Sequence, residues 1–356
     1  MAELLGLGIT HYPPLLGAPA GYANLLRIVS NAPGVPAELR EPANWPAAMQ
    51  AEYANELEAA REHEARHRAA LAEVRARIDD FQPDAVIIFG DDQYENFKES
   101  VIPPFNMYCM DGFHSRPFEL LQRLGNPDNI WGVPADHAYT VPGAGKLARE
   151  LAHAVIEQDC PIAYAYAYLH HDHLSHAFAN TCVFLDWDRR GWDYPIIPIS
   201  VNCYGTTVIQ SRGGFSHLMD TRPMAERDPY IDAPAPAGPT PRSCFHLGQT
   251  LRKVLDQRAE RVVVMASSGW SHAFLVEKHH YLYPDREFDQ CRVDELRAGR
   301  HAAWAELTNA AVEDAGSQEF KNWICLAGVF ADQRAHVIDY LDTWIFNSQK
   351  CFAVFE

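Results

Sequence analysis

The segment Arg261-Val262-Val263-Val264-Met265-Ala266, followed by Ser268-Gly269-Trp270-Ser271-His272, decides the fold. Its first part is a short apolar run rich in β-branched residues, which predicts a buried strand. Its second part presents a histidine just past the carboxyl end of that strand. Open α/β sheets bind ligands and carry catalytic groups at this edge. The segment therefore predicts an α/β protein with His272 in a cleft at the strand ends.

Two other apolar runs end in polar side chains in the same manner. Residues 4–10 lead to His11, and residues 84–90 lead to an acidic turn at residues 91–95. Between them, residues 47–80 carry apolar side chains at helical spacing among many Glu and Arg, which predicts a long amphipathic helix. A strand, a helix and a strand in this order favour parallel pairing. Because the carboxyl ends of parallel strands meet at one edge, we expect these polar groups to share one site.

The remaining segments predict further elements around this sheet. We expect strands at residues 161–168 and 194–201, helices at residues 145–157 and 244–257, an apolar segment at residues 180–186, and a helical carboxyl-terminal third that ends near Phe346. The Gly- and Pro-rich residues 204–242 have the length of a loop that covers a site as a lid. The expected fold is a single α/β domain over residues 1–356, with a central mixed, largely parallel sheet flanked by helices and an active-site cleft at the strand ends.

The composition argues against several classes of function. The 356 residues carry a formal charge of −17, whereas binding to a phosphate backbone or an anionic membrane requires clustered Lys and Arg. No apolar run reaches the ~18 residues of a membrane span, and Met1-Ala2-Glu3 lacks the basic start of a signal peptide. The eight cysteines form no C-x-x-C pair, which favours a reduced, mostly buried set. We therefore expect a cytoplasmic protein that binds neither nucleic acid nor membranes.

Histidine is unusually frequent, with 17 residues, and many of them fall in short clusters. One cluster follows the strand expected at residues 161–168 and contains His170, His171, His173 and His176. It fits either a solvated loop that supports a nearby site or a separate zinc site. Two imidazoles and a carboxylate with open positions are the ligands of non-haem Fe(II) oxygenases. His11, the turn at residues 91–95, the cluster at residues 170–176 and His272 all follow predicted strands, so one sheet edge could gather such a set, and Glu319 would have to come in from the helical third.

Eight short motifs follow one another along nearly the whole chain: Gly8-Ile9-Thr10-His11-Tyr12-Pro13-Pro14, Asp91-Asp92, Asp172-His173, Ile197-Pro198-Ile199-Ser200-Val201-Asn202, Cys244-Phe245-His246-Leu247-Gly248, Gly269-Trp270-Ser271-His272, Glu287-Phe288-Asp289 and Glu319-Phe320-Lys321-Asn322-Trp323. In this order they resemble the class III extradiol ring-cleavage dioxygenases, the family of the protocatechuate 4,5-dioxygenase catalytic subunit and of gallate-type dioxygenases. The resemblance implies O2-dependent opening of a catecholic aromatic ring at a mononuclear Fe(II) site, with Mn(II) as the alternative metal. It also implies a homo-oligomer, with a small helical partner subunit as in some members.

The resemblance assigns roles residue by residue. His11 matches the first iron-binding histidine, and Glu319 matches the iron-binding glutamate. His272 matches the histidine that takes a proton from the substrate hydroxyl and returns it, a role suited to a side chain that titrates near neutrality. His173 matches a histidine that contacts the substrate hydroxyl, and His176 is close enough in sequence to share that work.

Gln93 departs from the family's pattern, because the second iron-binding histidine would fall there. A carboxamide oxygen is a harder and weaker ligand than imidazole, so Fe(II) affinity should fall and the site should tilt toward Mn(II) or Mg(II). We expect Gln93 to coordinate the metal directly or through water. Two other arrangements would also complete the site: a carboxylate from Asp91, Asp92 or Glu95, or a nitrogen from His171 or His173.

Other interpretations of these residues stay open. Glu319 could be an ordinary acidic residue in a first helical turn, where it complements the helix dipole. Ser271 beside His272 does not suggest a serine hydrolase, because the segment lacks the second glycine of G-x-S-x-G. The alternative functions are a metal-dependent hydrolase or lyase on the same scaffold and a non-catalytic binding protein. Arg116 and Arg212, on expected loops, are candidates to bind a substrate carboxylate.

Overall fold

The fold is built around a mixed sheet of eight strands in the order β6-β3-β7-β2-β8-β1-β10-β9. The computed structural model describes residues 3–227 and 232–356. Four parallel strands form the centre of the sheet: β7 (Ile196–Val201), β2 (Ala85–Gly90), β8 (Arg261–Ser267) and β1 (Glu3–Ile9). Strands buried on both faces are continuous apolar runs, which is why the sequence marked them clearly. The predicted α/β fold with a central, largely parallel mixed sheet is confirmed.

The two edges of the sheet differ from the prediction. On one side, β10 (Lys350–Phe355) pairs antiparallel with β1 and with β9 (Ala335–Leu341), where we predicted helix up to Phe346. That prediction was wrong at β9, a half-buried strand whose pairing with β10 leaves no mark in the local sequence, whereas β10 itself lies beyond the predicted helix. On the other side, the strand predicted at residues 161–168 is reduced to β6 (Ala163–Ala165). β6 pairs with β3 (Phe105–Tyr108), which runs antiparallel to β7.

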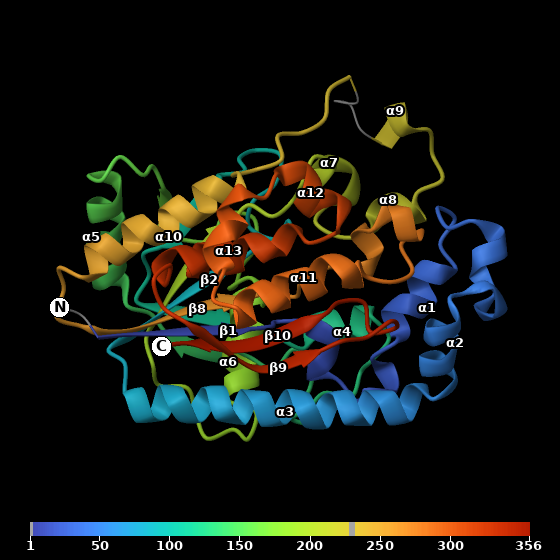
Figure 1. The fold of residues 1–356 in the computed structure, drawn as a ribbon, viewed down its shortest axis with the longest axis horizontal. Helices are drawn as coiled ribbons and strands as arrows, with labels where there is room; N and C mark the ends of the chain where they lie inside the picture. The colour runs from blue at the N-terminus through green and yellow to red at the C-terminus, as the bar shows by residue number, and fades with distance from the viewer. Residues whose placement is uncertain (1–2, 228–231) are drawn as a thin grey trace.

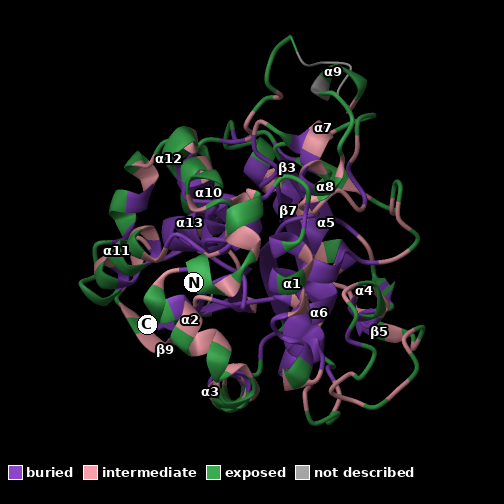
Figure 2. Ribbon diagram, turned by 90° about the vertical axis from the view of Figure 1, so that its right-hand side faces the viewer, coloured by how far each residue is buried: buried purple, intermediate pink, exposed green. Residues whose placement is uncertain are grey.

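Helices cover both faces of the sheet, as Figure 1 shows. α3 (Glu56–Phe81) runs along one face together with α6 (His176–Leu185), while α10 (Pro241–Leu255), α13 (Lys321–Val329) and α11 (Arg286–Arg297) lie on the other. Alternate strand residues serve the two layers: Leu7 and Val86 belong to the core under α3, whereas Ile87 and Val264 belong to the core under α13. Figure 2 shows the buried residues concentrated in the sheet and its inner helix faces.

Most predicted helices appear within a few residues of their expected bounds. The helix expected at residues 47–80 is divided at Asn55 into α2 (Ala47–Ala54) and α3. The helix expected at residues 145–157 is α5 (Gly145–Ile156). The apolar segment at residues 180–186 belongs to α6. The other elements are α1 (Asn24–Ser30), β4 (Gly112–Ser115), α4 (Glu119–Arg123), β5 (Tyr139–Pro142) and α12 (Asn309–Asp314).

The segment expected as a lid, residues 204–242, carries three short helices before α10 begins. They are α7 (Val208–Ser211), α8 (Ser216–Met219) and α9 (Met224–Arg227), and residues 228–231 of this segment lie outside the described part. Its first residues are tied to the rest of the molecule, because the Thr206 backbone N–H and hydroxyl both donate to Glu313 Oε1 at 2.6 Å. The segment is therefore partly ordered on the protein rather than an extended loop.

All eight cysteines lie within the described residues and are free. Seven are buried and Cys291 is exposed, which confirms the prediction of a reduced, mostly buried set. Across residues 3–227 and 232–356, none of the helices combines the length and the apolar character that crossing a membrane requires.

Candidate functional site

The carboxyl ends of β1, β8 and β2 lie side by side and bring polar side chains into one buried cluster. His11 follows β1, Asp91 follows β2 directly, and His272 follows β8. Glu319 enters from a single 3-10 turn, Gln318–Phe320, just before α13. The Ser268 hydroxyl donates to the Glu319 carbonyl at 3.0 Å and so fastens this turn to the end of β8. The helical third thus delivers Glu319 to the sheet edge.

His11 presents one ring nitrogen to two carboxylates. Its Nδ1 lies 2.8 Å from the Ser267 carbonyl oxygen, which can only accept, so Nδ1 carries the proton. The lone pair of Nε2 then faces Asp91 Oδ1 and Glu319 Oε2, each 3.5 Å away. The side chain is almost fully buried, and burial followed by the nearby His176 holds the pKa of His11 well below its usual value. A neutral imidazole whose lone pair points at two carboxylate oxygens is suited to bind a metal ion between them.

The two carboxylates of the cluster each keep one oxygen free. Asp91 Oδ1 and Glu319 Oε2 are buried and have no hydrogen-bond partner among the residues that the structure describes. Burial raises the pKa of both carboxyl groups, and the charge of Asp91 raises that of Glu319 further. The three atoms His11 Nε2, Asp91 Oδ1 and Glu319 Oε2 lie within 4.8 Å of one another. Buried polar atoms are rarely left unpaired, so the arrangement calls for a cation.

His272 lies beside this cluster with one nitrogen fixed and one free. Its Nδ1 donates to the Trp270 carbonyl at 2.8 Å, and its Nε2 lies 3.5 Å from Glu319 Oε1. Burial lowers the pKa of His272 to about 3, so the ring is neutral at pH 7. Only glycine fits at position 269, because a Cβ there would lie 2.9 Å from His272 Nε2. The segment around β8 thus holds an imidazole acceptor at a fixed position.

Gln93 reaches the cluster from a turn with an unusual backbone. Gln93 and Tyr94 have φ angles of 45° and 62°, in the left-handed region. The Gln93 amide donates to Glu319 Oε1 at 2.6 Å. Gly213, at φ +74°, packs on the backbone of this turn: a Cβ there would lie 2.6 Å from the carbonyl carbon of Gln93. The segment at residues 204–242 therefore covers the turn that carries Gln93.

His176 is the member of the histidine cluster that the structure places in the site. It begins α6, and its ring lies edge-on to His11 at a centroid distance of 5.4 Å. Its Nδ1 is 3.2 Å from Glu95 Oε1, and its backbone N–H donates to Glu95 Oε2 at 2.9 Å. Burial opposes protonation, but Glu95 and Asp91 outweigh it and raise the pKa of His176. His176 therefore holds a proton more readily than an ordinary imidazole does, and it lies beside the neutral His11.

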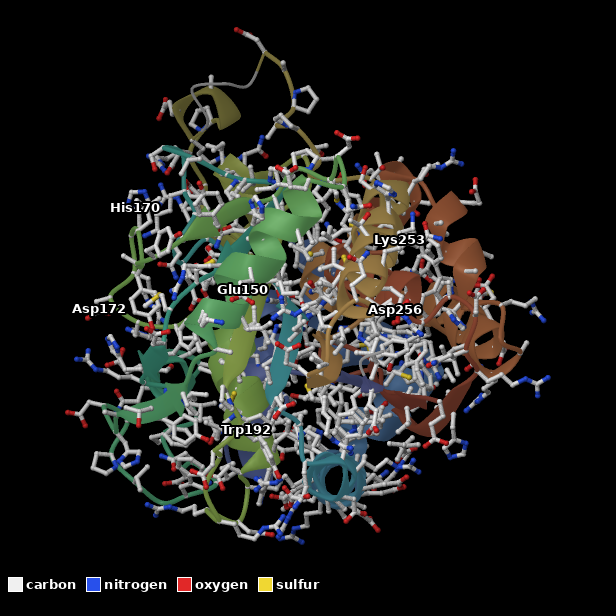
Figure 3. All side chains as sticks on the ribbon, turned by 90° about the vertical axis from the view of Figure 1, so that its left-hand side faces the viewer. Glu150, His170, Asp172, Trp192, Lys253 and Asp256 are labelled. Carbon is white, nitrogen blue, oxygen red and sulfur yellow. The ribbon has the colours of Figure 1, made fainter. Side chains whose placement is uncertain are left out.

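The other predicted site residues lie away from the buried cluster. His173 bonds to its neighbour, Nδ1 to Asp172 Oδ1 at 2.5 Å, and Arg116 lies 4.0 Å from the other oxygen of Asp172. Figure 3 shows His170 and Asp172 at the outer edge of the molecule. The ligand atoms of His171, Asp172 and His173 do lie close together, but on this outer loop. The structure thus brings together His11, Gln93, Glu319, His272 and His176, and leaves His173 and Arg116 outside.

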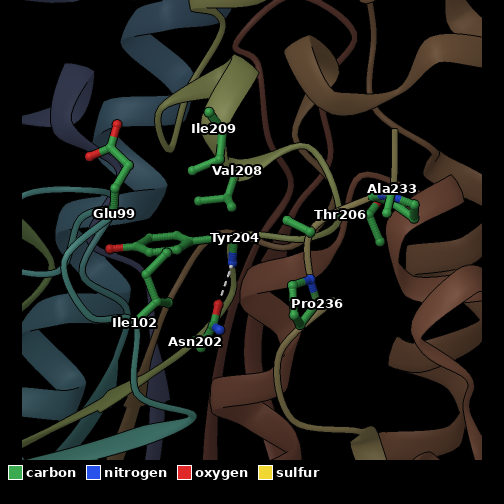
Figure 4. A pocket seen from close by; sticks show the side chains of 11 residues that line it. Glu99, Ile102, Asn202, Tyr204, Thr206, Val208, Ile209, Ala233 and Pro236 are labelled. Carbon is green, nitrogen blue, oxygen red and sulfur yellow. Dashed lines mark hydrogen bonds between the residues drawn. The ribbon is translucent and has the colours of Figure 1, made fainter. Parts of the chain in front are cut away.

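A hollow of about 320 Å³ lies beside Tyr204, and its lining includes none of the cluster residues His11, Asp91, Glu319 and His272. Its lining includes Ile102, Val208 and Pro236, and Figure 4 shows the Tyr204 ring between the first two of these. The Tyr204 hydroxyl lies on the other side, where it donates to Asp92 Oδ2 at 2.8 Å. Arg212 is exposed and is not among the residues that line this hollow. A hydrogen bond from Tyr94 and, to a smaller extent, the charge of Arg212 lower the pKa of the lining residue Glu99.

Comparisons with known proteins point to one family. Residues 231–352, which include His272 and Glu319, match the family described as "Catalytic LigB subunit of aromatic ring-opening dioxygenase". A 2,3-dihydroxyphenylpropionate/2,3-dihydroxicinnamic acid 1,2-dioxygenase from Paraburkholderia xenovorans is 27% identical over 203 residues, 56% of this chain and 47% of that protein. These similarities support the class III extradiol dioxygenase family. The resemblance found in the sequence is confirmed.

Two further relatives show how far the likeness extends. The proteins of the same name from Paraburkholderia phymatum and Pseudomonas putida are 25% identical over 307 residues and 31% identical over 130 residues. The former match covers 76% of this chain and 84% of that protein, and the latter 36% and 34%. The chain spans about half the length of the Paraburkholderia xenovorans protein and of a similar one from Klebsiella pneumoniae. The crystal structure of the uncharacterized protein JW3007 from Escherichia coli K12 aligns with a TM-score of 0.42 at 10% identity, over 77% of this chain and 86% of that one, too distant to bear on function.

Sequence reasoning missed two groups that shape this site. The Asn180 side-chain amide, in α6, donates to the His11 carbonyl at 3.0 Å. The Tyr204 hydroxyl, in the segment at residues 204–242, donates to the Asp92 carboxylate. No local pattern marks either residue, because both act across more than 100 positions of sequence. The sequence indicated the Asp91-Asp92 pair. It did not show that Asp92 accepts a hydrogen bond from Tyr204 while Asp91 faces His11.

Proposed function

We propose that this chain opens a catecholic aromatic ring of the protocatechuate or gallate type by O2-dependent extradiol cleavage at a mononuclear non-haem Fe(II) site, with Mn(II) as the alternative metal. One observation carries the proposal: a neutral, buried imidazole acceptor, His272, stands beside a cluster of unpaired ligand atoms at the strand ends. The family of ring-opening dioxygenases supports the same reaction. Because the similar proteins are named for 2,3-dihydroxyphenylpropionate, we include that catechol among the candidate substrates.

The residues of the cluster fit a divalent cation. Ligand atoms about 2.1 Å from one metal ion lie roughly 3.0–3.4 Å apart, and His11 Nε2 is 3.5 Å from both Asp91 Oδ1 and Glu319 Oε2. His11 and Glu319 would hold the metal, as the family resemblance implied. When bound, the metal would gather both substrate oxygens and O2 on one centre and carry the electrons between them.

The residues of this chain have separate tasks in the proposed reaction. His272 accepts the proton of a substrate hydroxyl at Nε2, because Nδ1 is held by the Trp270 carbonyl. His176 and Glu95 place a second titratable pair next to His11, where His176 can hold a proton near the substrate oxygens. Burial of His272 and Glu319 excludes bulk water from the site.

We propose the hollow beside Tyr204 as a path by which an aromatic substrate approaches the cluster, because its lining from Ile102, Val208 and Pro236 is apolar. Arg212 is exposed and remains a candidate to bind a substrate carboxylate. His173 and Arg116 remain candidates for substrate binding only through a change of their outer loop. We also propose one catalytic domain over residues 1–356, a homo-oligomer that binds a small helical partner, and a cytoplasmic location, which the free cysteines support.

Metal content and oxygen uptake test this function. Protein purified without O2 should contain one iron per chain and consume O2 in proportion to substrate on one member of a panel: catechol, protocatechuate, gallate, methylated gallates and 2,3-dihydroxyphenylpropionate. A His272→Phe variant should keep the metal and lose uptake by 10²- to 10⁴-fold, the usual weight of acid–base catalysis. Turnover that is indifferent to anaerobiosis would instead identify a metal-dependent hydrolase or lyase. Full uptake by His272→Phe would remove His272 from the mechanism.

A further inference from the structure

The acidic turn after β2 offers three carboxylates to the site, and two of them are fully engaged elsewhere. Asp92 accepts from the backbone N–H groups of Asn96 and Phe97, at 2.9 to 3.0 Å, and from the hydroxyls of Ser175 and Tyr204, at 3.0 and 2.8 Å. Glu95 holds His176 with both oxygens. Asp92 therefore fixes the turn and Glu95 orients His176, and neither has a lone pair directed at His11.

Asp91 is the carboxylate of this turn that is available to a metal. It is 1% exposed, and its Oδ1 faces His11 Nε2 at 3.5 Å with no other hydrogen-bond partner in residues 3–227 and 232–356. Its position is fixed by the register of the sheet, because it follows Gly90 at the end of β2, next to β8. A buried carboxylate oxygen without a partner lowers the stability of the fold unless a cation or a proton binds to it.

Gln93 makes a different contact. Its amide nitrogen donates to Glu319 Oε1 at 2.6 Å, and the same side chain hydrogen-bonds to the Asp91 carboxylate. An amide N–H₂ is a donor and cannot bind a cation. With Oε1 of Glu319 occupied by this donor, Oε2 is left free and directed at His11. The left-handed backbone at Gln93 and Tyr94, covered by Gly213, keeps the amide in this place.

We infer that Asp91, not Gln93, supplies the third protein ligand of a divalent cation, and that Gln93 is a positioning residue that fixes the Glu319 and Asp91 carboxylates through hydrogen bonds. The site then contains one imidazole and two carboxylates. This set is richer in oxygen than a site with two imidazoles, so it suits Mn(II) as well as Fe(II). The inference refines the proposed function by naming the metal-binding groups, and it replaces our expectation from the sequence that Gln93 coordinates.

Binding of Mn(II) alone separates the two roles without any turnover. Chelator-stripped protein is titrated with MnCl2, free Mn(II) is followed by its electron paramagnetic resonance signal, and binding heat gives an independent affinity. Asp91→Asn should weaken binding by more than about 100-fold, beyond the 10- to 100-fold that loss of a supporting contact costs. Asp188→Asn, at an exposed position away from both groups of metal-capable side chains, is the matched control and should bind as the wild type does.

The Gln93→Glu variant distinguishes a metal ligand from a positioning residue, because the two roles predict opposite changes in Mn(II) affinity. If Gln93 were a ligand, a carboxylate would bind more strongly than an amide and Mn(II) affinity would rise. If Gln93 positions Glu319, the variant removes a donor and sets a negative charge against Oε1, so affinity should fall by about 10- to 100-fold. Position 93 is partly exposed, so the variant is expected to fold, and its urea midpoint checks this.

Three results would overturn the inference: tighter Mn(II) binding by Gln93→Glu, unchanged binding by Asp91→Asn, or no binding by the wild type. Failure of the ring-opening reaction is a separate outcome. Wild-type protein that binds Mn(II) with the expected variant pattern, yet consumes no O2 with Fe(II) and the substrate panel, would leave the ligand set standing and refute the proposed function.

Discussion

Replacing Gly269 by alanine tests whether the position of His272 matters for the reaction. A Cβ at position 269 would lie 2.8 Å from Cε1 and 2.9 Å from Nε2 of the His272 ring, and 2.9 Å from Ser348 Oγ. Ordinary contact begins at 3.4 Å, so the ring must move by about 0.6 Å. A misplacement of 1 Å costs about 100-fold in rate, so this shift should lower kcat by roughly 10- to 20-fold.

The assay is O2 uptake by iron-loaded protein with the substrate that the panel identifies. Stability should fall by about 1–3 kcal/mol through overpacking, measured by urea unfolding. Gly214→Ala is the matched control, because no atom lies within 4 Å of a Cβ at that position. A Gly269→Ala enzyme with kcat within twofold of the wild type, and with the expected loss of stability, would refute the claim that the Nε2 position sets the rate.

Three further predictions concern the scaffold around the site. Tyr204→Phe removes the hydroxyl that donates to Asp92 and should lower the free energy of unfolding by about 1–3 kcal/mol in urea titrations. Burial lowers the pKa of His67 to about 3, so unfolding takes up one proton there between pH 3 and 6.5, and stability falls as the pH drops through that window. His67→Phe should reduce this slope by about 1.4 kcal/mol per pH unit, and an unchanged slope would contradict the burial argument. Gly248→Ala, whose Cβ would meet the Cys325 carbonyl at 2.1 Å where α10 crosses α13, should express poorly or unfold at clearly lower urea concentrations than the wild type.

The part of the fold that the sequence predicted well is the part governed by local pattern. β1, β2 and β8 are short apolar runs, each followed within a few residues by a polar group, and this pattern needs no knowledge of distant contacts. The prediction failed near the other end of the chain, where helix was expected up to Phe346. β9 is a strand there because it pairs with β10, and no local pattern shows that contact.

The sequence predicted which residues gather in the candidate site, but it did not predict the role of each. His11 and His272 follow predicted strands, so their meeting follows from the sheet. Which of Asp91 and Gln93 faces a cation depends on side-chain hydrogen bonds to Glu319, more than 200 positions away. Such contacts leave no periodic signal in the sequence. Likewise, nothing in the local sequence of the histidine cluster says that His176 faces inward from α6 while His173 stays on the outer loop.

The central place of β1 in the sheet has a consequence for how the chain is made. Its neighbours, β8 and β10, begin at Arg261 and Lys350, so the strand leaves the ribosome long before either partner exists. At about 5–20 residues per second, the wait for β8 lasts roughly 13–50 s. During that interval an apolar strand with both edges unpaired is open to other nascent chains. Expression at low temperature or with a holdase chaperone should therefore raise the soluble yield more than any change at the site.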